Sequence, residues 1–179
     1  RPSSTTRKPR LLWANSYCLL DTSSGASISV RQILHQLCRS GYEVEIVGAT
    51  IFDHPRGIEG LGSHWQTIKD AHNDDPNTIA NVTDGPLKHR LVATKSTVRS
   101  EIKFSESNTL YQTYINRLDD FKPDLVFFYG GQLWDFFIPH EARMRGVPSA
   151  AYLVNANYQG KRWCRDVDLI VTDTQATSN

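Results

Sequence analysis

The chain has 179 residues, of which 39% are hydrophobic and 22% are charged, and this is enough for one domain with a buried core. Twenty Lys and Arg residues balance 19 Asp and Glu residues, so the net charge of +1 gives no electrostatic reason to expect a nucleic acid or a membrane surface as partner. No apolar run approaches the roughly 20 residues that a membrane span needs, and no signal-peptide core opens the chain, so we expect a cytoplasmic protein.

The first 50 residues predict a strand, a helix and a second strand. Residues 1–9, RPSSTTRKP, are polar and basic and are expected to form a flexible leader. The stretch RLLWANSY (10–17) predicts a short buried strand. From Ser27 onward apolar residues recur at helical spacing, and Gly41 stands where that helix is expected to end. EVEIVGAT (43–50) predicts the second strand, which completes a βαβ unit with a right-handed parallel crossover.

The middle of the chain carries less regular signals. Residues 51–80 combine glycines, prolines and charges without sustained periodicity, so we expect mostly loop, with a short helix around 63–71. Residues 81–94 predict two short extended pieces around an Asp-Gly-Pro turn. An apolar stripe in SNTLYQTYINRLDDFKPD (107–124) predicts a helix.

The last third of the chain repeats the alternation. LVFFYGG (125–131) is a continuous apolar strand, as expected in a parallel sheet that is buried on both faces. Residues 132–146 predict a helix that is broken near Pro139, since proline is poorly tolerated inside a helix. VPSAAYLVN (147–155) and VDLIVTDT (167–174) predict two further strands.

This alternation predicts a single α/β domain over residues 10–179, with a Rossmann-like, doubly wound parallel sheet and helices on both faces. Ligands of such sheets bind beyond the carboxyl ends of the strands. The loops to search are therefore those expected at residues 14–27, 50–63, 129–135 and 155–162.

The stretch DTSSGASISVRQILHQL (21–37) has the composition of a phosphate-binding turn. A helix N-terminus presents unpaired N–H groups and a partial positive charge, and Gly25 lets a ligand approach the backbone closely. Asp21 is unfavourable beside a phosphate unless it points away or contacts a sugar hydroxyl. The hydroxyl residues of this stretch also suit an ordinary capped turn, and neither G-x-G-x-x-G nor G-x-x-x-x-G-K-[ST] is present. Both interpretations remain open from the residues alone.

Two other loops carry candidate contacts. In FYGGQLWD (128–135), Gln132, Trp134 and Asp135 could face a sugar by hydrogen bonding and stacking, or Trp134 could lie in the core behind a tight turn. In FDHPRG, Asp53 and His54 follow the second strand. His54 could act as a general base or Arg56 could contact an anion, whereas a solvated loop is the alternative.

Cysteine and histidine spacing predicts neither a disulfide framework nor a metal site. The three cysteines are far apart, and none belongs to a C-x-x-C pair. The six histidines show no H-x-H, H-x-x-x-H or H-E-x-x-H pattern. We expect reduced thiols, no metal and no bound cofactor.

The order and spacing of four segments resemble the N-terminal domain of GT-B-fold glycosyltransferases of the group 1, family 4-like type. LLWANSYCLLDTSSGASISVRQILHQLCRSGYEVEIVGAT is similar to the family's first strand, Gly-containing loop, helix and second strand. FKPDLVFFYGG, RGVPSAAYLVN and VDLIVTDTQATSN are similar to three later strand segments. The resemblance covers nearly the whole chain beyond the leader.

The resemblance implies one Rossmann-like half of a two-domain enzyme that moves a sugar from a nucleotide-sugar donor to a glycan, lipid or protein acceptor, without an obligatory metal. In the family this half mainly binds the acceptor, while a C-terminal domain, absent from this chain, holds most of the donor. The loop after the first strand closes over the donor diphosphate, which assigns that role to Ser24, Gly25 and Ala26. The chain alone is therefore expected to be inactive.

The sequence departs from the family in the first loop, where the double glycine of many relatives is here only SSGAS, and again after the strand at residues 125–131. Many relatives carry a histidine after the strand that here ends FFYGG, and no histidine stands at residues 129–135. Tyr129 or Gln132 could take its place among the acceptor contacts. The alternative function is a non-catalytic Rossmann-like module that binds a carbohydrate or a protein.

Overall fold

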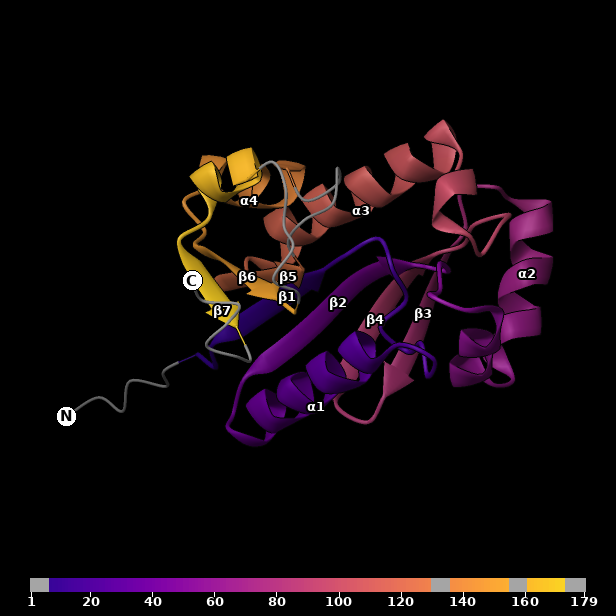
Figure 1. Cartoon of the computed structure of the whole chain (residues 1–179), viewed down its shortest axis with the longest axis horizontal. Helices are drawn as coiled ribbons and strands as arrows, with labels where there is room; N and C mark the ends of the chain where they lie inside the picture. The colour runs from indigo at the N-terminus through magenta and orange to yellow at the C-terminus, as the bar shows by residue number, and fades with distance from the viewer. Residues whose placement is uncertain (1–6, 130–135, 155–160, 173–179) are drawn as a thin grey trace.

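The computed structural model describes residues 7–129, 136–154 and 161–172 (Figure 1). It contains a seven-stranded sheet in the order β3-β4-β2-β1-β5-β6-β7. Every neighbouring pair is parallel except the antiparallel pair β3–β4 at one edge. The predicted α/β class and Rossmann-like sheet are confirmed.

The elements follow one another along the chain as the sequence alternation predicts. The strands are β1 (Arg10–Ala14), β2 (Glu43–Ala49), β3 (Ile79–Asp84), β4 (Leu87–Val92), β5 (Leu125–Tyr129), β6 (Ser149–Leu153) and β7 (Leu169–Thr172). The α-helices are α1 (Gly25–Arg39), α2 (His64–Asp74), α3 (Phe104–Phe121) and α4 (Phe137–Met144), and the 3-10 helices are η1 (Pro55–Leu61), η2 (Arg99–Glu101) and η4 (Lys161–Asp166).

Helices cover both faces of the sheet, with α1 on one side and α3 and α4 on the other (Figure 1). The sequence of β1 is almost wholly apolar because helices cover both faces of this strand. Leu12 and Ala14 pack in the cluster with α3 and α4, whereas Leu11 and Trp13 pack in the cluster with α1. Alternate side chains of a strand point to opposite faces, so a strand covered on both faces needs apolar residues at every position.

Local signals set the two ends of α1. The Ser24 side chain caps the first turn, and Val30 and Leu34 form the buried stripe. The helix ends at Arg39, and Gly41 then adopts a φ of +96°, in the left-handed region that glycine enters without strain. The end predicted near Gly41 is thus confirmed.

The expectation of mostly loop for residues 51–80 is wrong. The 3-10 helix η1 occupies part of this segment, and α2 extends the short helix expected around residues 63–71. Helix α2 buries only Ile68 and His72, so its apolar stripe is too narrow to stand out in the sequence. A 3-10 helix is short and has no amphipathic repeat of the α-helical kind, so periodicity does not reveal it.

The break expected at Pro139 does not occur in α4. The helix begins at Phe137, so Pro139 lies in its first turn. Backbone N–H groups in the first turn have no partner within the helix, and a proline there removes no hydrogen bond. Among the residues described, no helix combines the length and apolar character that crossing a membrane requires.

Candidate functional site

At β1 the helical connections of the sheet change from one face to the other. This strand lies between β2 and β5; the chain leaves β1 for α1 on one face, and α4, which follows β5, packs on the opposite face. Doubly wound sheets bind ligands in the crevice at such a switch point. The loop between β1 and α1 therefore borders the expected binding edge.

The start of α1 presents open backbone donors at this edge. The Ser24 side chain accepts a hydrogen bond from the Ser27 N–H at 3.4 Å, and the Ser24 carbonyl accepts one from Ile28 at 3.1 Å. Nothing among the described residues accepts a hydrogen bond from the N–H groups of Gly25 and Ala26. These two donors and the positive end of the helix dipole remain available to an anion.

Asp21 joins the β1–α1 loop to the loop after β2. Its side chain is fully buried and accepts hydrogen bonds from the Ser23 N–H at 2.8 Å and the Ser23 hydroxyl at 2.5 Å. It also accepts one from the Asp53 N–H at 2.7 Å, on the loop after β2. The carboxylate thus ties the β1–α1 loop to the β2–η1 loop.

Two glycines let η1 pack closely against the β1–α1 loop. A Cβ atom added at Gly57 would collide with the Asp21 carboxylate, and one added at Gly60 would collide with the Leu20 carbonyl. Both glycines keep φ outside the left-handed region, so close approach and not an unusual φ explains them. By contrast, a Cβ at Gly25 would meet nothing within 4 Å, so in the structure itself this position is open.

These contacts bring together two loops that the sequence analysis treated separately. Between them lies an open hollow of about 400 Å³, lined by Thr22, Ser23, His54, Arg56 and Glu59. We call this cavity the Arg56 hollow. Two of the expected contacts, the loop around Gly25 and His54, are therefore neighbours at one edge of the fold.

A third loop reaches the same edge near Asp53. The Arg99 guanidinium lies over the Tyr17 ring, 5.8 Å from its centre. Burial raises the pKa of the Tyr17 phenol, the Arg99 guanidinium opposes that rise, and the Asp53 carboxylate adds to it. The phenol therefore stays protonated at neutral pH. In the β1–α1 loop, next to Tyr17, burial raises the pKa of the Cys18 thiol to about 12, which makes the thiol a poor nucleophile.

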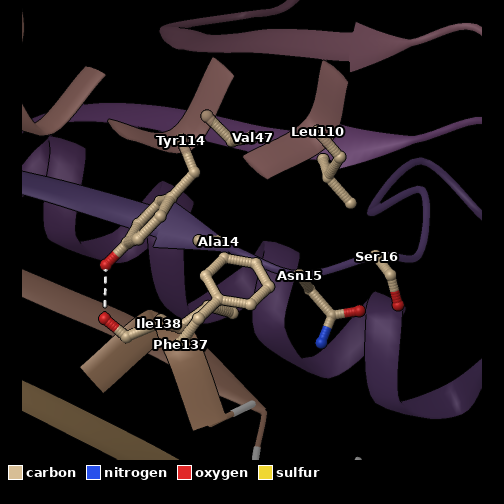
Figure 2. Close-up of a pocket in the computed structure, with 8 residues that line it drawn as sticks. All are labelled: Ala14, Asn15, Ser16, Val47, Leu110, Tyr114, Phe137 and Ile138. Carbon is tan, nitrogen blue, oxygen red and sulfur yellow. Dashed lines mark hydrogen bonds between the residues drawn. The ribbon is translucent and has the colours of Figure 1, made fainter. Parts of the chain in front are cut away.

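A small pocket lies on the other side of the switch point, against α3 and α4 (Figure 2). Its volume of about 10 Å³ corresponds to a single water. The apolar side chains of Tyr114, Phe137 and Ile138 form one side, and Asn15 and Ser16 form the other. The Tyr114 hydroxyl donates a hydrogen bond to the Ile138 carbonyl at 2.7 Å.

No motif in the sequence points to Asn15 and Ser16. Both side chains are about 95% buried, and the Asn15 side-chain oxygen accepts a hydrogen bond from the Tyr17 N–H at 2.8 Å. The signal that could have found them is their position, since they are the first polar residues after the apolar run of β1. Because β1 borders the switch point, polar residues directly after this strand lie at the switch point.

The remaining expected contacts do not join this group. Tyr129 ends β5 and packs on the α1 side, with its ring centre 4.9 Å from that of Trp13. Strand β1 separates it from the loop that carries Asp53 and His54. Gln132 and Trp134 lie outside the described residues. Within the described ranges no group of His, Cys, Asp and Glu side chains could hold a metal ion.

No family model and no curated protein matches this chain. Its fold is similar to that in the crystal structure of MurG from Acinetobacter baumannii, with 15% sequence identity and a TM-score of 0.53. The alignment covers 94% of this chain and 42% of MurG, so the chain spans about two fifths of the length of that protein. MurG is a GT-B glycosyltransferase, and the likeness shows that this chain has a GT-B-like, Rossmann-like fold.

Proposed function

We propose that this chain is the acceptor-side half of a glycosyltransferase that moves a sugar from a nucleotide-sugar donor to a glycan, lipid or protein acceptor. The observation that carries the proposal is the open N-terminus of α1 at the carboxyl edge of the sheet, where Gly25 and Ala26 offer two unpaired N–H groups. The similarity of the fold to that of a glycosyltransferase supports it.

In the proposed reaction an acceptor hydroxyl forms a bond to the sugar's anomeric carbon, and the bond from that carbon to the donor diphosphate breaks. The diphosphate leaves with the bonding electrons and gains negative charge in the transition state. Helix N–H groups at Ser24, Gly25 and Ala26 stabilise that charge, as fixed donors do in anion sites. This arrangement needs no metal to bind the diphosphate, and the nucleotide itself would be held mainly by a second domain.

The acceptor hydroxyl must lose its proton to a base. Asp53 and His54 are exposed at the same edge, directly after β2. We assign the Asp53 carboxylate as that base and His54 as an acceptor contact, because Nδ1 of His54 already accepts a hydrogen bond from the Arg56 N–H. Asn15 and Ser16 lie at the switch point, but the pocket that they line with Phe137 has room for only a single water, so we assign the sugar to the open edge beside Asp53 and His54.

The proposal is tested by NMR titration of the ¹⁵N-labelled chain with UDP-glucose, UDP-N-acetylglucosamine and GDP-mannose. Because a second domain would supply most of the affinity for the nucleotide, the donors are added to concentrations high enough to reveal weak binding, and one of them should shift the amide signals of Ser24, Gly25 and Ala26. In Gly25→Val the branched side chain covers the open N–H groups, and the space around Gly25 lets the variant fold, so these shifts should disappear. In a full-length enzyme the same variant should lower kcat by about 100-fold.

The matched control is Ser29→Val, which adds a branched residue at an exposed position of the same helix. It should leave donor binding unchanged. Absence of any amide shift with all three donors, or unchanged donor binding in Gly25→Val, would contradict the proposal. Binding of a free oligosaccharide without any response to nucleotide sugars would favour the alternative, a non-catalytic carbohydrate-binding module.

A further inference from the structure

The Arg56 hollow contains a cation that the fold does not use. The Arg56 side chain is exposed and lines the hollow, and it forms no ion pair with any residue in the described part of the chain. By comparison, Arg145 pairs with two carboxylates, Asp119 and Glu141, each at 2.6 Å. Arg56 is therefore free to pair with a ligand.

His54 is a second hydrogen-bond donor in the hollow, because one of its ring nitrogens is already engaged as an acceptor. The backbone N–H of Arg56 donates to Nδ1 of His54 at 3.2 Å. Because that nitrogen accepts, a neutral imidazole must carry its proton on Nε2. His54 therefore offers an N–H donor from Nε2, and Thr22 and Ser23 contribute hydroxyl groups to the same lining.

The two walls of the hollow are held in place before any ligand arrives. Asp21 joins Ser23 on one wall to the backbone of Asp53, next to His54, on the other. Gly60 brings η1 so close to the opposite loop that no larger residue fits. A site with fixed walls loses little conformational entropy when it binds.

We propose that the Arg56 hollow binds an oxyanion group, a phosphate or a carboxylate, on a sugar-containing ligand. The Arg56 guanidinium pairs with the oxyanion, and the His54 and hydroxyl donors complete its hydrogen bonds. Glu59 lies in the same lining and accepts a hydrogen bond from a neighbouring hydroxyl of the sugar. Only the identification of the ligand as a glycosyltransferase substrate rests on the proposed function.

The test is an NMR titration of the ¹⁵N-labelled chain with inorganic phosphate at constant ionic strength. Saturable shifts are expected at the amides of Thr22, Ser23 and Arg56. Arg56→Gln should weaken phosphate binding by about tenfold or more, because it removes the charged donor. Glu59→Gln removes a repulsive charge and should strengthen phosphate binding by about threefold.

The matched control is Arg39→Gln at the far end of α1, which changes the net charge by the same amount as Arg56→Gln. It should leave phosphate binding unchanged. Equal loss of binding in Arg39→Gln and Arg56→Gln would overturn the inference, since it would show a non-specific charge effect. Weaker phosphate binding in Glu59→Gln, or wild-type binding in Arg56→Gln, would overturn it as well.

Two further titrations distinguish the source of the oxyanion. If it belongs to the acceptor, glucose 6-phosphate or glucuronate should bind more weakly to Arg56→Gln, while UDP binding is unaffected. If it belongs to the donor, UDP binding should be weakened instead. Donor shifts at Ser24–Ala26 without phosphate shifts at Arg56 would overturn this inference alone, whereas the reverse pattern would overturn the proposed function alone.

Discussion

Two buried carboxylates, Asp21 and Glu106, join loops at the carboxyl edge of the sheet, one beside the Arg56 hollow and one at the start of α3. Asp21 accepts hydrogen bonds from the Ser23 N–H and the Asp53 N–H, at 2.8 and 2.7 Å. Through these bonds it holds the loop that leads into α1 against the loop that leads into η1. Its surroundings are the two walls of a proposed binding site.

Glu106 uses the same chemistry for a different purpose. It accepts hydrogen bonds from the Lys95 N–H at 2.7 Å and the Lys103 N–H at 2.8 Å, and His72 lies 3.6 Å away. These bonds attach the loop after β4 to the first turn of α3. A buried carboxylate with backbone donors therefore does not by itself mark a binding site, and its position beside the open hollow that contains Arg56 is what distinguishes Asp21.

Replacing each acid with its amide tests whether Asp21 and Glu106 differ in their roles. Asp21→Asn and Glu106→Gln should each lower the free energy of unfolding by about 3 kcal/mol, because an amide NH₂ then faces backbone N–H donors. Urea denaturation measures this loss. Only Asp21→Asn should also weaken phosphate binding in the Arg56 hollow. Equal weakening of phosphate binding in both variants would contradict the distinction between the two regions.

A buried imidazole without partners gives the opposite case. His89 on β4 is 1% exposed, and neither of its ring nitrogens has a hydrogen-bond partner among the residues that the structure describes. Burial lowers its pKa to about 4 from the model-peptide value of 6.5, and the nearby Asp84 only partly opposes this. The unfolded chain thus takes up a proton as the pH falls below about 6.5, and the folded chain does so only near pH 4.

The free energy of unfolding should therefore decrease as the pH is lowered from about 6.5 to about 4. His89 accounts for a loss of about 2 kcal/mol between pH 7.5 and pH 5. Urea denaturation of the wild type and of His89→Leu at both pH values measures this contribution, and the variant should show a smaller loss. A pH dependence of the same size in both proteins would mean that His89 is not buried in its neutral form.

Gly60 in η1 and Gly25 at the start of α1 differ in how closely they approach their neighbours. Gly60→Ala places a methyl group against the Leu20 carbonyl and should lower the free energy of unfolding by about 1 to 2 kcal/mol. It should also separate the walls of the Arg56 hollow and weaken phosphate binding. Gly25→Ala meets no neighbour, and its stability should match that of the wild type within about 0.5 kcal/mol. Equal stability of the two variants in urea would show that η1 is not packed closely on this loop.

Local patterns were sufficient for much of the fold. The apolar stripe of α1, its Ser24 cap and Gly41 are all contained in one short stretch, and the continuous apolar run of β5 indicates its burial on both faces. Helix η1 was missed because its glycines serve contacts with Leu20 and Asp21, which are distant in the sequence. No local pattern encodes such contacts.

The candidate site shows the same division. The turn around Gly25 was predicted from its composition and its place after a strand. An anion contact of Arg56 was one alternative open from the sequence, but the hollow was not predicted, because its walls come from residues 22–23 and 54–59, and their contact depends on the buried Asp21. Asn15 likewise becomes a candidate only once the strand order shows that β1 borders the switch point.

The central claim is that the start of α1 is an anion site at the carboxyl edge of the sheet. A crystal structure of the chain grown with UDP tests it most directly. Diphosphate oxygens are expected within hydrogen-bonding distance of the Gly25 and Ala26 N–H groups. A diphosphate bound at the opposite edge of the sheet, or away from α1, would contradict it.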